Sequence, residues 1–165
     1  MEERSHQQVS AFFKLINNPV KFRLFLLKNL PSAYFSGVRV RSVSEETCTV
    51  TIPFKWFTRN PFRSTYFACL SMAAEMSTGV LAMAHCYKRT PAISLLVTGI
   101  EGNFIKKATG RTKFVCKDGL QILSAIEKAA ASKEGHSYKA MTSGYNEMNE
   151  LVAEFAITWS FKRRK

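Results

Sequence analysis

Aspartate is nearly absent from this chain, since Asp118 is the only one in 165 residues. Lys and Arg total 24 against 12 acids, which gives a formal net charge of +12 and makes a polyanionic partner plausible. Three interpretations of this charge stay open: a solvated basic surface, then a phosphate-bearing small ligand, and last a nucleic acid. We expect no nucleic acid, because most aromatic residues fall at core-like spacings and do not alternate with the bases.

The chain also lacks the closely spaced residues that metal sites and nucleophilic triads require. It has four Cys and three His, and no two cysteines form a CxxC pair. We therefore expect no metal, and no Ser/His/Asp triad has local support. The cysteines lie within apolar patterns and are predicted to be buried thiols, at positions Cys48, Cys69, Cys86 and Cys116.

Two further absences concern location and domain organisation. The N-terminus Met-Glu-Glu-Arg-Ser-His lacks the apolar core of a cleavable signal, so we expect a cytoplasmic protein. Repeats and Pro/Gly/Ser-rich stretches are missing, which argues against a disordered linker. We predict one globular domain over residues 1–165, with residues 1–30 as an N-terminal helical extension and residues 163–165 as a basic tail.

Residues 64–87 lack charge almost completely, because Glu75 is their single charged residue. The segment is rich in Ala, Met and Leu, contains no Pro and begins with Ser64 and Thr65 as candidate N-caps, so it predicts one long helix. A membrane span is the less favoured alternative, because five Ser/Thr residues, the Glu and a His favour a helix wrapped by a sheet. A carboxylate in such a helix needs compensation, and Glu75 is therefore the leading candidate for a functional residue.

The remaining pattern predicts an α+β fold in which a curved antiparallel sheet wraps around this helix. Strand alternation is clearest over residues 150–162, and Cys48, Val50, Ile52, Phe54 and Trp56 are expected on one side of another strand. In the helix predicted over 19–30, packing across the domain is favoured over contact of its basic and apolar faces with a membrane. The predicted helices cover residues 6–17, 19–30, 64–87 and 119–132, and the predicted strands cover residues 38–43, 47–56, 93–107, 112–117, 137–145 and 150–162.

Two stretches, in this order and with this strand pattern, resemble a known family. The first runs from Asn60 to Glu75 as NPFRSTYFACLSMAAE, and the second from Asn103 to Gly110 as NFIKKATG. They are similar to motifs of the hotdog-fold acyl-CoA thioesterase superfamily, and especially of its poorly characterised thioesterase-like branch. The resemblance covers roughly residues 30 to 162 and implies a hotdog fold with N-terminal helices added.

The resemblance implies that the chain is an acyl-CoA thioester hydrolase in which Glu75 acts as general base or nucleophile. Asn60 would orient the carbonyl or the water, while Ser64 and Thr65 would donate hydroxyls or cap the helix. The helix start would bind the substrate carbonyl, and CoA phosphates would contact a basic cluster. The residues concerned are Tyr66, Phe67 and Ala68 at the helix start, and Lys106, Lys107, Arg111 and Lys113 in the cluster.

The resemblance further implies a homodimer, or a tetramer built from dimers, with coenzyme A present only as part of the substrate. One departure from the family pattern leaves a second function open. Many active relatives carry His-Gly-Gly at the helix start, where this chain has Tyr66-Phe67-Ala68. The alternative is therefore a hotdog protein that binds acyl-CoA or a fatty-acyl group without turnover.

Overall fold

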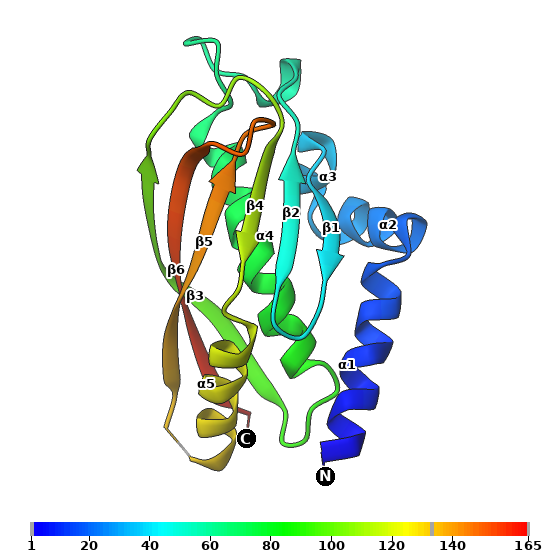
Figure 1. The fold of residues 1–165 in the computed structure, drawn as a ribbon. Coiled ribbons are helices and arrows are strands. Elements are labelled where there is room, and N and C mark those ends of the chain that lie inside the picture. The colour runs from blue at the N-terminus through cyan, green and yellow to red at the C-terminus, as the bar shows by residue number, and fades with distance from the viewer. Residues whose placement is uncertain (1, 133, 165) are drawn as a thin grey trace.

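A computed structural model describes residues 2–132 and 134–164, with side chains from residue 9 onward. Its six strands form a single antiparallel sheet in the order β1-β2-β4-β5-β6-β3, curled around one long helix (Figure 1). The elements in chain order are α1 (Glu2–Ile16), α2 (Pro19–Asn29), α3 (Pro31–Ser36), β1 (Arg39–Val43), β2 (Cys48–Ile52), the short 3-10 helix η1 (Trp56–Thr58), α4 (Phe67–Cys86), β3 (Ile93–Phe104), β4 (Thr112–Cys116), α5 (Gly119–Ala131), β5 (His136–Tyr145) and β6 (Leu151–Arg163).

The long helix α4 is the core of the fold. Small side chains such as Ala73, Ala74 and Ala82 are completely buried, which allows the sheet to approach the helix closely. By length and composition alone α4 could cross a membrane, but most of its residues are buried inside the protein. The interpretation of this segment as a helix wrapped by a sheet is therefore confirmed.

Hydrogen bonds as well as apolar packing fix α4 against the sheet. Ser77 Oγ donates to the Ala74 carbonyl at 2.7 Å and lies 2.8 Å from Thr142 Oγ1 of β5. A hydroxyl has only one hydrogen to donate, so Thr142 is the donor to Ser77. Around this contact the largest fully buried side chains include Phe114 and Phe155, whose rings meet edge to face at 5.7 Å. The core thus sits between α4 and the concave face of the sheet.

Strand β3 forms one edge of the sheet and β1 forms the other. β3 pairs with β6 over nearly its whole length, from Ile93 opposite Arg163 to Phe104 opposite Ala153. β6 has the clearest alternation in the sequence, because it lies inside the sheet and packs one face on α4. The adjacent strands β1 and β2 form a hairpin, with Ser44 N donating to the Thr47 carbonyl across the turn.

Helix α5 follows β4 and lies on the lower part of the sheet in the view of Figure 1. Asp118, the residue before α5, does not cap the helix with its side chain. Its carboxylate instead accepts hydrogen bonds from the Met141 backbone N–H at 2.7 Å and from the Tyr138 hydroxyl at 3.2 Å. The single aspartate of the chain therefore ties the α5 start to β5.

The N-terminal helices agree with the prediction in position and differ in detail. Asn18 caps α2, accepting from Lys21 N at 3.0 Å, and Pro19 is the first helical residue. Phe22 and Leu26 pack into the core, so packing across the domain is confirmed for that face of α2. Helix α3 was not predicted: its six residues are too few for a periodic pattern to be visible.

Two further expectations are wrong. Trp56 does not continue the buried side of β2, which ends at Ile52, and its side chain is 77% exposed in η1. Alternation cannot show where a strand stops, and Pro53 interrupts the ladder here. The cysteine prediction holds for Cys48, Cys69 and Cys116, which are buried free thiols, whereas Cys86 is half-buried.

Candidate functional site

Glu75 lies in the middle of α4 and is half-buried. Within the described ranges its carboxylate has neither a hydrogen-bond donor nor a cationic partner. Burial raises the pKa of the Glu75 carboxyl above its ordinary value, because the charged form loses water without gaining a compensating partner. The anomaly seen in the sequence therefore persists in the folded protein.

The wall beside Glu75 is formed by Trp159 of β6. A Cβ placed on Gly79 would stand 3.0 Å from Glu75 Oε1 and 3.1 Å from Trp159 Cζ2. The carboxylate and the ring therefore both pack against this glycine. The Trp159 Nε1–H donates to Thr78 Oγ1 at 2.9 Å, and Thr78 donates in turn to the Glu75 carbonyl at 2.9 Å. The indole is thus locked in place, and its apolar ring helps to keep water from the carboxylate.

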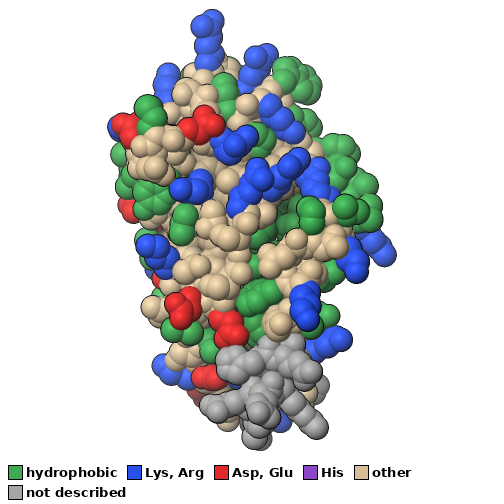
Figure 2. Space-filling view, turned by 45° about the vertical axis from the view of Figure 1, so that its right-hand side comes forward, with side chains coloured by type: hydrophobic (Ala, Val, Ile, Leu, Met, Phe, Trp, Pro, Cys, Tyr) green, Lys and Arg blue, Asp and Glu red, His purple; other side chains and the backbone are tan. Residues whose placement is uncertain are grey.

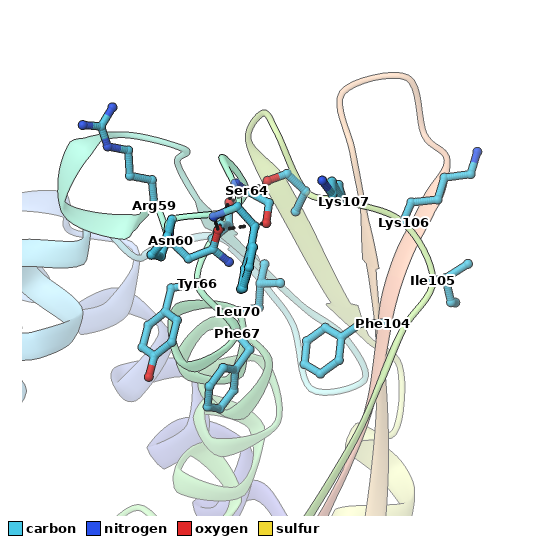
Figure 3. A pocket seen from close by; sticks show the side chains of 14 residues that line it. Arg59, Asn60, Ser64, Tyr66, Phe67, Leu70, Phe104, Ile105, Lys106 and Lys107 are labelled. Carbon is cyan, nitrogen blue, oxygen red and sulfur yellow. Dashed lines mark hydrogen bonds between the residues drawn. The ribbon is translucent and has the colours of Figure 1, made fainter.

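A cleft of about 760 Å³ opens at the N-terminal end of α4 (Figure 3). On one side lies the loop from Arg59 to Tyr66, and on the other the end of β3 with the segment that follows it. Phe67 and Leu70 from the first turn of α4 line it next to Phe104 and Ile105. The cleft is therefore largely apolar and aromatic, with Lys106 and Lys107 on the same wall.

Asn60 organises the loop before α4. Its Oδ1 accepts from Phe62 N at 3.0 Å, from Ser64 N at 3.2 Å and from Ser64 Oγ at 3.2 Å. These bonds fold the loop back on itself, as an Asx turn does, and they occupy the amide oxygen. In this structure Asn60 therefore shapes the cleft wall, and its Nδ2 is the group left for a ligand.

The start of α4 differs from the prediction. Tyr66 is the residue before the helix, and no side chain caps it, so Ser64 and Thr65 are not N-caps. Thr65 Oγ1 donates instead to the Ala108 carbonyl at 3.0 Å, and Thr65 N donates to the same oxygen. This pair of bonds ties the loop to the segment after β3. The backbone N–H groups of Phe67 and Ala68 make no hydrogen bond within the part of the chain that the structure describes.

The structure gathers most of the residues singled out in the sequence. Those that line the cleft are Asn60, Ser64, Thr65, Tyr66, Phe67, Lys106 and Lys107. Glu75 and Ala68 do not line it: Glu75 comes five residues after Leu70, about 7.5 Å further along the helix axis. Arg111 is separated from the others, because it lines a different concavity beside β1.

The basic residues near the cleft are not equivalent. Lys106 Nζ pairs with Glu150 Oε1 at 2.7 Å, and both side chains remain largely exposed. Lys113 donates to Asn149 Oδ1 at 3.2 Å. Lys107 makes no ion pair among the described residues, so its charge is the one available to an anionic ligand at this wall.

Sequence reasoning missed several residues that build this region. Phe104 and Ile105 line the cleft and are half exposed, and Trp159 stands over Glu75. The NFIKKATG motif carries the first two, so their position there was a usable signal. The sequence carried no signal for the role of Trp159, because a tryptophan in an alternating strand is predicted to be an ordinary core residue. No group of His, Cys, Asp or Glu able to hold a metal ion occurs among the described side chains, those of residues 9–132 and 134–164.

Comparisons with known proteins support the fold. The model of one sequence family, described as "Domain of unknown function (DUF4442)", matches residues 22–161. No curated protein matches the chain significantly in sequence.

Solved structures resemble the chain closely in fold and weakly in sequence. A Pseudomonas aeruginosa protein of unknown function, described as a probable thioesterase, superposes with a TM-score of 0.75 at 18% identity, over 88% of this chain and 97% of that one. A putative thioesterase from Shewanella oneidensis gives a TM-score of 0.70 at 11% identity, over 90% and 98%. The PaaI protein of Escherichia coli, from the phenylacetic acid degradation operon, gives 0.61 at 12%, over 92% and 96%. The predicted hotdog fold is confirmed.

Proposed function

We propose that this chain, which belongs to the family described as "Domain of unknown function (DUF4442)" and has the hotdog fold, hydrolyses acyl thioesters such as acyl-CoA. The observation that carries the proposal is the unpaired, half-buried carboxylate of Glu75 on the core helix. Burial raises the pKa of this carboxyl, which brings its proton affinity toward that of an effective general base. Several solved structures of the same fold are described as thioesterases.

The proposed chemistry needs only a base and donors for the developing oxyanion. The Glu75 carboxylate takes a proton from water, the water oxygen bonds to the thioester carbon, and the C–S bond breaks. The proton passes to the departing thiolate, so the products are a carboxylic acid and a thiol. The N–H groups of Phe67 and Ala68 at the α4 start make no hydrogen bond among the described residues and are suited to a carbonyl oxygen. They lie about 10–12 Å along the helix axis from Glu75, so the α4 start of a second copy would have to supply them to a thioester held at Glu75. In an alternative mechanism Glu75 acts as the nucleophile: its carboxylate attacks the thioester carbon and expels the thiolate, and water then hydrolyses the resulting anhydride.

The cleft supports an acyl thioester carried on a phosphorylated group. Its aromatic wall suits an apolar chain, and Lys107 offers an unpaired charge at the same wall for a phosphate. Lys106 would have to exchange Glu150 for the ligand. Arg111 is less suited, because it lines the other concavity.

We also propose that the site is completed in a homodimer formed through β3. This strand is a sheet edge of 12 residues that exposes Leu96, Ile100 and Phe104, so it presents both free backbone groups and apolar side chains to a second copy. Trp159, which stands over Glu75, pairs with Val97 of β3, so a partner on this edge would lie close to the carboxylate. Leu96→Lys should lower the mass measured by light scattering, and an unchanged mass would contradict a β3 interface.

Thiol release from a panel of acyl-CoAs tests the hydrolase. We expect turnover that falls by at least about a hundredfold in Glu75→Gln, because the base is lost while the side-chain shape is kept. Glu147→Gln is the matched control, since it removes the same charge from an exposed position in the β5–β6 turn. Equal turnover by Glu75→Gln and the wild type would exclude Glu75 as the base.

Binding without turnover is the second candidate function. It is favoured by Tyr66 and Phe67, whose rings pack edge to face at 4.8 Å and stand exposed at the α4 start, where a substrate carbonyl has to approach. Calorimetry with a thioether analogue of acyl-CoA separates the two functions. Tight binding of the analogue together with no thiol release from any acyl-CoA in the panel would establish the binder and refute the hydrolase.

A further inference from the structure

A second concavity, of about 270 Å³, lies at the β1 edge of the sheet, opposite the β3 edge. Five basic side chains line it, and no acidic side chain does. We call it the cationic pocket, and its bases are Arg23, Arg39, Arg41, Lys55 and Arg111. Three segments far apart in the sequence, α2, the β1–β2 region and the start of β4, thus bring like charges together. Such a concave positive site concentrates anions.

The charges of the cationic pocket are not neutralised by the protein. No ion pair among the side chains of residues 9–132 and 134–164 includes any of the five. Three of them are held in place by neutral oxygens: Arg23 donates to the Tyr34 carbonyl, Arg41 Nε to Thr51 Oγ1 at 2.8 Å, and Lys55 Nζ to the Phe35 carbonyl at 2.8 Å. These contacts orient the cations without cancelling their charge, so the pocket is prepared for an anion with several oxygen atoms.

Helix α2 contributes an apolar surface beside this pocket. Its buried face is formed by Phe22 and Leu26. The outward face carries Val20, Leu24 and Leu27 at positions i, i+4 and i+7, and all three are exposed. The core packs on the opposite face of α2, so this second apolar face stays exposed and has no partner among the described residues.

The apolar surface continues beyond α2. The Phe35 ring of α3 lies 6.4 Å from the Phe57 ring of η1, and Trp56 next to it is the most exposed large apolar side chain described. Figure 2 shows hydrophobic side chains along the right-hand edge of this face, beside gathered Lys and Arg. We call this surface the apolar ridge, and its members are Val20, Leu24, Leu27, Leu30, Phe35, Trp56 and Phe57.

The pocket and the ridge adjoin. A groove of about 500 Å³ shares Arg23, Arg39 and Arg41 with the cationic pocket and is also lined by Val20 and Leu24 of the ridge. An anionic group in the pocket would therefore lie next to the apolar side chains. Amphipathic helices that lie in a membrane interface combine these two features, basic side chains flanking an apolar face.

Charge decides between the possible occupants. A second copy placed by a two-fold axis would set the same basic pocket against itself, and the like charges would repel. A nucleic acid would need aromatic rings free for stacking inside the basic groove, but Tyr34 is covered by the Arg23 guanidinium at 3.7 Å. A soluble phosphate would leave the apolar ridge exposed to water. An anionic phospholipid bilayer matches both halves of the surface.

We propose that this face docks on an anionic phospholipid bilayer, with a lipid phosphate in the cationic pocket and the apolar ridge inserted among the acyl chains. The proposal does not depend on thioester hydrolysis. Arg59 and Asn60 of the cleft follow η1 directly, so docking would bring the mouth of the cleft close to the lipid.

Cosedimentation with vesicles tests the electrostatic half. We expect binding to phosphatidylcholine vesicles that contain phosphatidylserine and none to phosphatidylcholine alone. Arg39→Ala together with Arg111→Ala should lower the partition coefficient about twenty-five-fold, from about fivefold per charge removed. Both side chains are exposed and make no hydrogen bond to a described residue, so folding should survive, which thermal unfolding verifies. The matched control, Lys128→Ala with Lys162→Ala, makes the same change in net charge on α5 and β6.

Insertion of the apolar ridge into the bilayer is tested by separate variants and by tryptophan fluorescence. Leu24→Ser with Trp56→Ser should weaken vesicle binding by about tenfold or more, whereas Leu120→Ser with Met148→Ser, at exposed positions elsewhere, should not. Trp56 emission should shift to the blue when anionic vesicles are added, because the exposed indole enters an apolar medium.

Four results would overturn the proposal. The first is no binding to the anionic vesicles, and the second is an equal loss of binding in the control pair of charge variants. The third is binding of inorganic phosphate or glycerol phosphate without vesicle binding, which would assign the pocket to a soluble anion. The fourth is a smaller oligomer in Leu24→Ser with Trp56→Ser by light scattering, which would assign the ridge to a second copy.

Discussion

Replacing Glu75 by Gln should make the protein more stable at neutral pH. Its half-buried carboxylate has no partner within the described residues, so its charge is desolvated without compensation. An unsatisfied buried polar group costs about 1–3 kcal/mol. Because Glu75 keeps some contact with water, we expect a gain of about 1–1.5 kcal/mol in the free energy of unfolding. For a chain of this size that raises Tm by about 2–6 °C.

The gain should depend on pH in a defined direction. Burial raises the folded-state pKa of Glu75 above that of the unfolded chain. Below the unfolded pKa both states are protonated, and the carboxyl costs nothing. As the pH rises, the unfolded state loses its proton first, so the free energy of unfolding falls until the pH has passed the folded pKa. The wild type should therefore lose stability across this window relative to Glu75→Gln.

Urea unfolding of both proteins, at about pH 4 and about pH 8, measures the difference. Glu147→Gln serves as the control, because it removes an exposed carboxylate. A Glu75→Gln protein that is less stable than the wild type at the higher pH would refute the reasoning, since the carboxylate would then have a stabilising partner. If Glu75→Gln gains stability and also loses thiol release, the Glu75 carboxylate is a group that lowers the stability of the protein and is needed for its activity.

Three further changes test the surroundings of Glu75 and the core. Gly79→Ala should lower turnover about a hundredfold, because the new methyl displaces the Glu75 carboxylate. It should also lower Tm, because the methyl presses on the Trp159 ring, which its hydrogen bond to Thr78 holds in place. An unchanged kcat would show that this position is not needed. Thr78→Val should lower the free energy of unfolding in urea by about 1–3 kcal/mol, because it leaves the Trp159 N–H unpaired. Thr78→Ser keeps the hydroxyl and should retain most of the wild-type stability. Equal losses in the two variants would point to packing instead. Phe114→Ala should cost about 3–5 kcal/mol in the same assay because the ring is fully buried, and a loss under about 1 kcal/mol would contradict its place in the core.

The order and type of the main elements could be predicted because local pattern decides them. The uncharged, Ala-rich stretch around Glu75 gave α4, and the alternation after residue 150 gave β6. Asn18 followed by Pro19 fixed the start of α2 by chemistry that is complete within four residues. Where the deciding partner is distant, prediction was wrong. Ser64 and Thr65 look like N-caps, but Thr65 bonds to Ala108, which is 43 residues away.

The candidate site was predicted in its membership more than in its geometry. Asn60, Tyr66 and Lys107 all line one cleft. The amide oxygen of Asn60, however, accepts hydrogen bonds from its own loop and is not directed to a ligand. Arg111 could not be placed from the sequence, because strand pairing decides which concavity it faces. A position in a motif says which residues belong together, and only the fold says what each side chain contacts.

The sequence by itself determined that one carboxylate would stand in an apolar helix within an α+β fold, because charge, hydrophobicity and periodicity are properties of the chain. Only the tertiary structure decided that this carboxylate has no partner in the described chain and that Trp159 stands beside it. It alone brought five bases into one pocket and left the outward face of α2 uncovered. Pairing, burial and the lack of a partner are relations between segments distant in sequence, and packing is what creates them.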